Sequence, residues 1–386
     1  MITPSIHLYG RPTGAEPHWK DLTRGTGKSW KRVTHRLYGY LSASFELSSD
    51  NLSESEIIWL YNSAIGCTVR ELTAGMTTWE GLIWDMRLIV GGVQYVRTLD
   101  AEWTHNKVKA VYSSDIGLRT ATAWTENEDA SDEYGEMQYI DSMGGATAAG
   151  AAALVARRIA EHAWPRSRMT GSVAIGNRSS GVSLQVTCVG YYATLNWRYY
   201  TANTTAAASS LISTLVGLSE FVTAGRIETN TLSVRANSSD TERQQRIGDL
   251  LTGIITQGDA SGNVWQGGVY AGKKFRYEQA PTDYTYALQR GRLLTRGMSE
   301  PAPTMVEPGF LARNLDAPMG YPSHGTDSAW DDPAIGYVEQ VEYSTSGGLS
   351  VQFLGAEAQM AILQAQIASG SLPRSTNKST NKMRNA

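Results

Sequence analysis

This 386-residue sequence has little of what small disulfide-rich or membrane proteins depend on. Its two cysteines, Cys67 and Cys188, each lie in an apolar stretch, which argues against a disulfide framework and predicts two small buried hydrophobes. No apolar run is long enough to cross a membrane. The first residues, MITPSIHLYGRP, lack the basic start and apolar centre of a signal peptide. We therefore expect a soluble chain made in a cytoplasm.

Charge and phenylalanine are also scarce. Charged residues make up 18% of the chain and the formal net charge is −3, so no overall attraction draws it to nucleic acid or to an acidic membrane surface. Only five phenylalanines accompany 19 tyrosines and 11 tryptophans. Tyrosine and tryptophan combine a large apolar body with a polar group, which suits half-exposed sheets, protein interfaces and sugar-binding clefts alike.

The strongest pattern is a series of strands in the first 112 residues. Residues 79–112 predict a strand, a turn at Gly91-Gly92 and two further strands, forming a meander that contains no nucleophile, metal cluster or phosphate loop. Residues 67–72 predict a strand that leads into it. Another strand is expected over 36–47, with one buried face made of Leu37, Leu41, Ala43, Phe45 and Leu47.

Later strands are predicted by alternation and by turn residues. Leu184, Val186 and Cys188 alternate with polar residues, and this strand continues to Tyr200. Prolines at 299–333 predict a long ordered loop. The remaining β segments are expected at 169–176 before a turn at 177–181, at 226–236, at 258–277, and at 337–355 as a hairpin around Gly347-Gly348.

Helices are predicted by caps and by apolar spacing. Ser53 and Glu56 form a capping box that starts a short helix closed by Gly66, and Ser239 with Glu242 starts another. The other predicted helices are an alanine-rich one at 146–165, one at 205–224 with Leu211, Leu215, Leu218 and Val222 at helical spacing, and a last one at 356–369 before a basic, flexible tail.

Three motifs that could carry chemistry are incomplete. GTGKS at 25–29 resembles the end of a phosphate-binding loop, but Leu22 stands where that motif needs glycine. SHGTDS at 323–328 holds His324, Asp327 and Ser328 side by side, whereas a catalytic triad draws its members from separate elements. GGATAAG at 144–150 is partly like a dinucleotide fingerprint but follows no clear parallel strand. We predict no catalytic residue, no cofactor and no enzyme activity.

Histidines and aromatic pairs are the other candidate groups. Aromatic pairs such as Trp103 with Trp124, or Tyr191-Tyr192 with Trp197, could stack on sugars or bases, although sheet packing is the commoner explanation. Paired carboxylates of a glycosidase cannot be read from sequence spacing. The histidines lack metal-ligand spacing, so no metal site is predicted from His7, His18, His35, His105, His162 and His324.

An acidic run at 126–136 breaks the strand pattern. It has no matching cations in its own segment, and its spacing does not follow a calcium loop, so a solvated loop is the simplest interpretation. Its carboxylates are Glu126, Glu128, Asp129, Asp132, Glu133 and Glu136.

Four passages together resemble the tail-hub proteins of tailed phages and of related contractile injection systems. The resemblance covers most of residues 28–200 and extends more loosely to about 355. No peptidase or lysozyme-like domain follows, and the chain is short for the family. The passages are KSWKRVTHRLYGYLSASFEL, TTWEGLIWDMRLIV, DEYGEMQYIDSMGGATAAGAAALVARRIAEHAWP and LQVTCVGYYATLNWRYY.

The resemblance implies a mainly β fold with helices (α+β), in which two tail-tube-like antiparallel β-barrels are joined by a helix-containing segment. It further implies smaller α/β and loop-rich C-terminal regions. The domains expected are 1–115, a first barrel with an N-terminal arm; 116–168, the acidic loop and helical connector; 169–204, the start of a second barrel; 205–298, a helical and β insertion; 299–355, a loop and hairpin completing that barrel; and 356–386, a helix and basic tail.

The function that the resemblance implies is that of a structural virion protein, assembled in the host cytoplasm and located at the tail tip. A homotrimeric hub ring would adapt the hexameric tail tube to a trimeric spike or fibre, with the distal tail or tube protein and the tape measure protein as further partners. Genomic DNA would pass through the ring without stable binding, and no membrane would be bound. Channel-lining side chains would then be Glu126, Glu128, Asp129, Asp132 and Glu133.

Two other functions remain open. A hexameric distal-tail or tube-like protein would show one barrel and a separate peripheral domain. A carbohydrate-binding or carbohydrate-active β protein would show a cleft, and a glycosidase would place two facing carboxylates in it.

Overall fold

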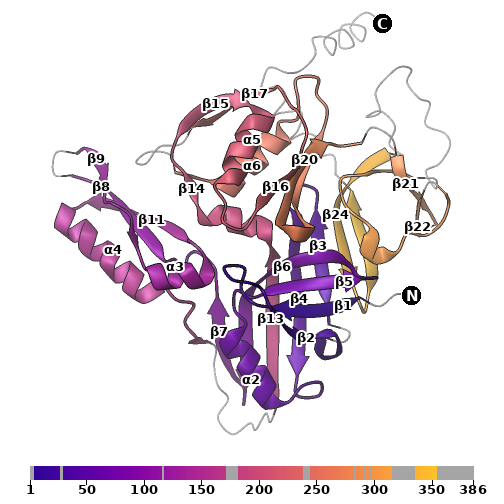
Figure 1. The fold of residues 1–386 in the computed structure, drawn as a ribbon, viewed down its shortest axis with the longest axis horizontal. Coiled ribbons are helices and arrows are strands. Elements are labelled where there is room, and N and C mark those ends of the chain that lie inside the picture. The colour runs from indigo at the N-terminus through magenta and orange to yellow at the C-terminus, as the bar shows by residue number, and fades with distance from the viewer. Residues whose placement is uncertain are drawn as a thin grey trace, which may run out of the picture.

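The computed structural model describes residues 4–26, 29–114, 117–170, 181–237, 244–281, 284–290, 292–295, 297–314 and 335–353. The fold is mainly β with several helices, as expected. Figure 1 shows a large sheet, a projecting α/β lobe on one side, a helix pair above the sheet and a small second group of strands on the other side. None of the described helices combines the length and the apolar character that crossing a membrane requires.

The large sheet is built around strand β13. Val186 of β13 lies opposite Phe45 of β4 on one side and opposite Met86 of β6 on the other. The predicted alternation is confirmed, because Leu184, Val186 and Cys188 are buried while Gln185 and Thr187 are exposed. Both neighbours run antiparallel to β13, and the three strands are β4 (Gly39–Ser48), β6 (Met76–Val90) and β13 (Val182–Gly190).

The sheet extends from both sides of this centre. The first half of β6 pairs with β5, which continues to β1 and β2, and its second half pairs with β7, which continues to β12. On the other side β4 pairs with β3, then β24 and β25. The bounds are β1 (Ser5–Tyr9), β2 (His18–Asp21), β3 (Lys31–His35), β5 (Thr68–Thr73), β7 (Val93–Thr98), β12 (Arg168–Thr170), β24 (Ile335–Ser344) and β25 (Gly348–Phe353).

Two closed barrels are not what the described strands form. Their pairings branch but never return to their starting point, so the sheets are open. The segment expected to begin a second barrel contributes β13, and this strand lies in the centre of the first sheet. The position of β13 between β4 and β6 therefore joins two regions that the sequence pattern separates.

The alternation of buried and exposed side chains expected for residues 36–47 is wrong at one position. Ala43, Phe45 and Leu47 are buried as predicted, but Leu41 is only partly buried and Tyr40 takes its place in the core. The register between β3 and β4 shifts at this point, since Val33 lies opposite Ser42 and Thr34 opposite Tyr40. A bulge of this kind turns every side chain beyond it to the other face of the sheet.

The predicted capping box is confirmed at the start of helix α2 (Glu54–Ser63). The Ser53 side chain accepts a hydrogen bond from the Glu56 amide, and the Glu56 carboxylate accepts one from the Ser53 amide. The helix ends at Ser63, before Gly66, whose φ of 78° suits the following turn into β5. Helix α2 thereby covers one face of the large sheet.

The expected meander is wrong at its third strand. β6 and β7 form the predicted hairpin around Gly91-Gly92. Strand β8 leaves this sheet and pairs with β9, β10 and, in parallel, β11. With helices α3 and α4 they form the projecting lobe: β8 (Lys107–Ser113), β9 (Arg119–Ala121), β10 (Thr125–Glu126), α3 (Glu128–Tyr134), β11 (Gln138–Gly145) and α4 (Ala148–His162).

The chain leaves the large sheet after Gly190. Residues expected to continue the strand to Tyr200 instead form a short 3-10 helix, because their aromatic side chains turn inward: Tyr191, Tyr192 and Trp197 are all buried. The helices that follow are shorter than expected, and Leu218 lies beyond the end of α5. The elements are η1 (Tyr191–Trp197), β14 (Tyr199–Tyr200), β15 (Asn203–Ala207), α5 (Ala208–Gly217), β16 (Thr223–Ile227), β17 (Ser233–Asn237), β18 (Gln245–Arg246) and α6 (Ile247–Thr256).

Strand β19 connects the helix pair to the large sheet through a close contact with β4. A Cβ atom on Gly39 would lie 2.2 Å from the Val269 carbonyl oxygen, and Gly39 has a φ of 71°. Glycine is required there on both grounds. The C-terminal hairpin is confirmed, and these last elements are β19 (Trp265–Tyr270), η2 (Ala271–Lys273), β20 (Lys274–Gln279), β21 (Tyr284–Gln289), β22 (Arg292–Thr295), η3 (Pro303–Met305) and β23 (Leu311–Asn314).

Several predicted features lie outside the described residues. They are the middle of GTGKS, the turn at 177–180, the capping box at Ser239 and Glu242, the SHGTDS motif, the helix at 356–369 and the basic tail. The proline-rich stretch is described as far as residue 314, where it holds the short helix η3 and strand β23.

Candidate assembly surfaces

The first candidate surface lies on strand β2 and helix α2. Trp19 is 37% exposed and Trp59 is 45% exposed, and their ring centroids are 6.0 Å apart. Ile58 lies beside them, also exposed. Because β2 pairs only with β1 among the described strands, these rings stand at an open edge of the sheet. Apolar side chains clustered at an open strand edge are typical of a protein interface.

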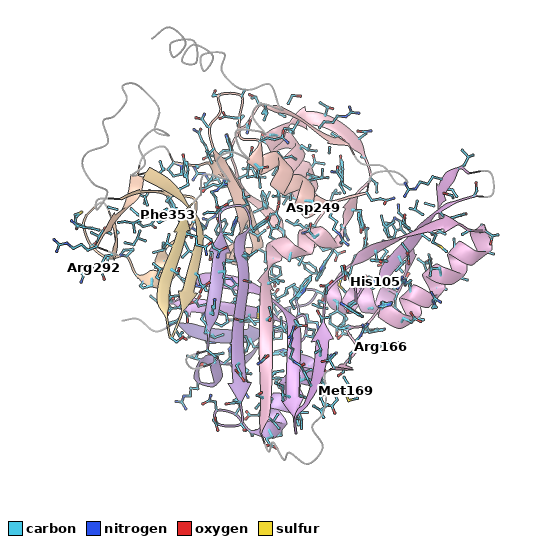
Figure 2. All side chains as sticks on the ribbon, turned by 180° about the vertical axis from the view of Figure 1, so that it is seen from behind. His105, Arg166, Met169, Asp249, Arg292 and Phe353 are labelled. Carbon is cyan, nitrogen blue, oxygen red and sulfur yellow. The ribbon has the colours of Figure 1, made fainter. Side chains whose placement is uncertain are left out.

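The second candidate surface lies at a different edge, on strand β12. Met169 is 70% exposed, and Figure 2 shows it at the outer rim of the sheet. Neighbouring Arg168 places its guanidinium 4.2 Å from the ring centre of Trp103, which is 49% exposed. Among the described strands β12 pairs only with β7. Two of the edges of the sheet, at β2 and at β12, therefore expose large apolar groups.

These surfaces were missed by the sequence analysis. Trp19 lies in the N-terminal arm, for which no strand was predicted, although β1 and β2 form there. Ile58 and Trp59 could have been found, because a helical projection of α2 puts Ile57, Leu60 and Tyr61 on its buried face and leaves these two outside. Met169 carries no such signal, since only the pairing of β12 with β7 shows that it stands at an edge.

The acidic run forms helix α3 and its flanks, and it is not without cations. Lys107 pairs with Glu126 at 2.9 Å and with Glu136 at 2.8 Å. Partial burial disfavours the charged amine, but Glu136 and Glu126 outweigh it and raise the pKa of Lys107. Arg11 pairs with Glu133 at 2.9 Å. These cations come from other segments of the chain. The expectation of an acidic run without matching cations is therefore wrong for Glu126, Glu133 and Glu136.

The outer face of α3 remains acidic. Glu128, Asp129 and Asp132 are exposed, whereas Glu126 and Glu133 are bound in the ion pairs described above. The candidate channel residues are therefore of two kinds. Three are exposed to solvent, whereas Glu133 pairs with Arg11 of the body and Glu126 pairs with Lys107 within the lobe.

The candidate aromatic residues pack within the sheet and the lobe, which was the commoner explanation of their pattern. Trp103 lies under Arg168, and Trp124 lies under the Lys109 amine, 4.8 Å from its ring centre. Trp197 stacks on Trp84 with centroids 5.9 Å apart. Within the chain that the structure describes, these rings pack as sheet and lobe contacts and none of these named pairs forms a stacking platform.

Two histidine pairs form that the sequence did not reveal. The His7 Nδ1 and His18 Nε2 atoms are 3.1 Å apart across β1 and β2. The rings of His105 and His162 stack with centroids 4.7 Å apart at the base of the lobe. No group of three or more His, Cys, Asp or Glu side chains suited to a metal ion occurs among the described residues. Cys67 and Cys188 are free and buried, as expected.

The glycine-rich stretch at 144–150 was dismissed on a ground that is wrong. It does follow a parallel strand, because β11 runs parallel to β8, and it opens helix α4. The first turn of that helix is already capped, since the Thr147 side chain accepts a hydrogen bond from the Gly150 amide at 3.1 Å. The helix start thus has its own side-chain acceptor.

Comparison with known proteins places few constraints on this chain. No protein-family model matches it, and no curated protein matches it. Among solved structures it is similar to a tail protein from Neisseria meningitidis MC58, with 9% identity over 91% of this chain and 94% of that one. The TM-score of that superposition is 0.38, too low to assign a shared fold or function.

Proposed function

We propose that this chain is a structural subunit of a phage tail and forms the hub ring at the tail tip. The observation that supports this best is the pair of open edges, one with Trp19 and Trp59 and one with Met169. A head-to-tail ring needs two different surfaces on each subunit, one for each neighbour. A chain that stayed alone would be expected to protect such edges.

The choice of a hub ring over another kind of ring rests on the resemblance of residues 28–200 to tail-hub proteins. A homotrimer would adapt the hexameric tail tube to a trimeric spike or fibre, in contact with the distal tail or tube protein and the tape measure protein. The lightly charged, aromatic-rich composition suits broad subunit interfaces.

The acidic face of α3 is proposed to line the channel. Glu128, Asp129 and Asp132 are exposed and would repel the phosphates of passing DNA, which keeps the passage from binding its cargo. Glu126 and Glu133 would contribute less, because Lys107 and Arg11 offset their charge. An image of the ring with α3 on the outer rim would contradict this part of the proposal.

The ring is tested by measuring the mass of the purified chain in solution over a range of concentrations. We expect a trimer for the natural sequence and monomers for Trp59→Asp and for Met169→Asp, because each places a charge in one proposed interface. Met298→Asp is the matched control, since Met298 is 54% exposed and lies on neither edge.

Mixing the two monomeric variants sharpens the test. Each retains one intact surface, so together they should form dimers that cannot close into a ring. A natural chain that stays monomeric at every concentration would overturn the proposal, and a hexamer would favour a distal-tail ring instead.

A further inference from the structure

A cleft lies where the large sheet meets the helix pair. It has a volume of about 380 Å³ and is walled by the ends of β4 and β13, by η1 and by α6. Figure 2 labels Asp249 on α6 beside this junction. The size falls in the range of small-molecule sites. The side chains that carry the argument are Tyr38, Tyr40, Tyr192, Asn196, Asp249 and Thr252.

The aromatic wall of the cleft is held in place before any ligand binds. The rings of Tyr38 and Tyr192 meet edge to face with centroids 5.1 Å apart. The Tyr192 hydroxyl donates to the Gly248 carbonyl at 2.8 Å and lies 2.8 Å from the Thr252 hydroxyl. A ring fixed by packing and by hydrogen bonds loses little freedom on binding.

Polar groups at the cleft have unused hydrogen-bonding capacity. The Asn196 side-chain oxygen is buried and accepts no hydrogen bond from the described residues. The Asp249 carboxylate is exposed at the rim and has no ion-pair partner in the described part of the chain. A buried acceptor without a donor costs free energy, and a ligand hydroxyl that reached this oxygen, which packs against Gly248, would recover it.

The balance of charge selects the class of ligand. Among the described residues, no lysine or arginine lines the cleft, and a carboxylate stands at its rim, which disfavours a phosphate or other anion. The Asp249 carboxylate is exposed at the rim, so a cation would gain only a solvent-screened ion pair that contributes little, and a cation is not favoured either. A purely apolar ligand would leave Asn196 and Asp249 unpaired.

We propose that this cleft binds one neutral sugar unit of a glycan, with its C–H face against Tyr38 and its hydroxyls donating to Asp249 and Asn196. The rings would supply apolar contact and the two acceptors would set the orientation of the sugar. This binding is separate from ring formation, because the cleft lies at neither edge proposed for assembly.

The test is a titration of the full chain with glucose, galactose, mannose and N-acetylglucosamine, each followed by saturation-transfer NMR and calorimetry. At least one sugar should bind saturably, and Asp249→Asn should weaken it about tenfold, as expected for the loss of a charge-assisted hydrogen bond. Asp132→Asn, an exposed carboxylate on the distant lobe, is the control and should bind as the natural chain does.

Tyr38→Ala provides a second variant whose folding is checked by far-ultraviolet circular dichroism. It should also lose binding while keeping the natural spectrum. Absence of saturable binding to all four sugars, or unchanged binding by Asp249→Asn, would overturn the proposal. Saturable binding of arginine amide in place of the sugars would do the same and would identify the cleft as a pocket for a cationic side chain.

Discussion

The large sheet and the projecting lobe are built in different ways. The sheet depends on contacts between distant segments, with β13 at residues 182–190 set between β4 and β6. The lobe is local, and its own small core lies between sheet and helix α4: Val108, Ala110, Tyr112, Ala151 and Val155. The sheet buries whole aromatic clusters, whereas polar and charged groups play a large part in joining the lobe to the body.

The joint between the lobe and the body contains ion pairs and hydrogen bonds between distant segments. Arg11 pairs with Glu133, and Arg198 pairs with Glu136 at 3.3 Å, so residues of the body hold the acidic flank of α3. Asn106 donates to the Gly135 carbonyl at 2.8 Å at the same place. Such partly exposed ion pairs contribute little stability, so the joint depends more on Tyr134 and Met137, which are buried in the core of the large sheet.

The largest effect should come from a buried charge in the sheet. Glu71 and Arg32 form an ion pair with side chains 0% and 1% exposed. Burial raises the pKa of the Glu71 carboxyl even though Arg32 lowers it. Glu71→Gln would leave the guanidinium uncompensated and should lower the free energy of unfolding by about 3–5 kcal/mol. Urea denaturation measures this, with the exposed Glu46→Gln on β4 as a nearly neutral control.

A matched pair of valines compares the two cores directly. Val186 in β13 and Val155 in α4 are each 2% exposed. Truncation of either to alanine should cost on the order of 2 kcal/mol, from lost apolar contact and the cavity that remains. Hydrogen exchange should show Val186→Ala weakening amides throughout the sheet and Val155→Ala weakening only those of the lobe. Equal and global loss from both variants would show that the lobe is no separate unit.

The joint should respond to acid. Burial lowers the pKa of His105 to about 4 against an opposing hydrogen bond to the Ala101 carbonyl, and His162, Arg158 and Asp141 are the charged or titratable groups that act on it. The pKa of His105 in the folded state is below its unfolded value of 6.5. The neutral imidazole therefore stabilises the folded state above pH 6.5, and this contribution is lost as pH falls toward 4.

The protection factors of amides at the base of the lobe, corrected for the intrinsic pH dependence of exchange, should therefore fall between pH 6.5 and 4 more than those of amides in β13. His105→Gln should flatten that difference, because glutamine does not titrate. A natural chain in which lobe and sheet respond equally to acid would contradict the assignment of the effect to His105.

The smallest effect should come from a single ion pair of the joint. Glu133 is partly exposed, and Glu133→Gln should change the free energy of unfolding by less than about 1 kcal/mol. Thermal unfolding at low and high salt measures this, and the difference from the natural chain should shrink as salt screens the pair. A loss comparable to that of Glu71→Gln would show that the joint is as rigid as the sheet.

Much of the local structure was predictable because side-chain period and caps act over a few residues. The alternation of Leu184, Val186 and Cys188, the capping box at Ser53 and the turn at Gly91-Gly92 all appear as expected. The bulge at Leu41 was not predictable, because it depends on the register with β3. The same holds for the departure of β8, whose partner β11 is some thirty residues further on.

The candidate surfaces follow the same division. Trp59 could have been placed outside α2 from its helical position, but the edge on which Met169 stands exists only through strand pairing. The acidic run was recognisable as a charge cluster. Its cations, Arg11 and Lys107, could not be assigned to it, because nothing in local spacing records which distant segments meet.

Local sequence pattern was enough to locate several strands and helices, including α2, β13 and the hairpin of β6 and β7, and to predict that both cysteines are buried. These properties depend on the period of side chains and on the cost of burying polar groups, which are local. Strand pairing places β13 in the first sheet and leaves the sheets open, with apolar side chains at two edges. Ion pairs with distant cations offset the charge of Glu126, Glu133 and Glu136 in the acidic run. Those outcomes depend on contacts between segments far apart in the chain, where packing and charge pairing choose among strands that local pattern leaves equivalent.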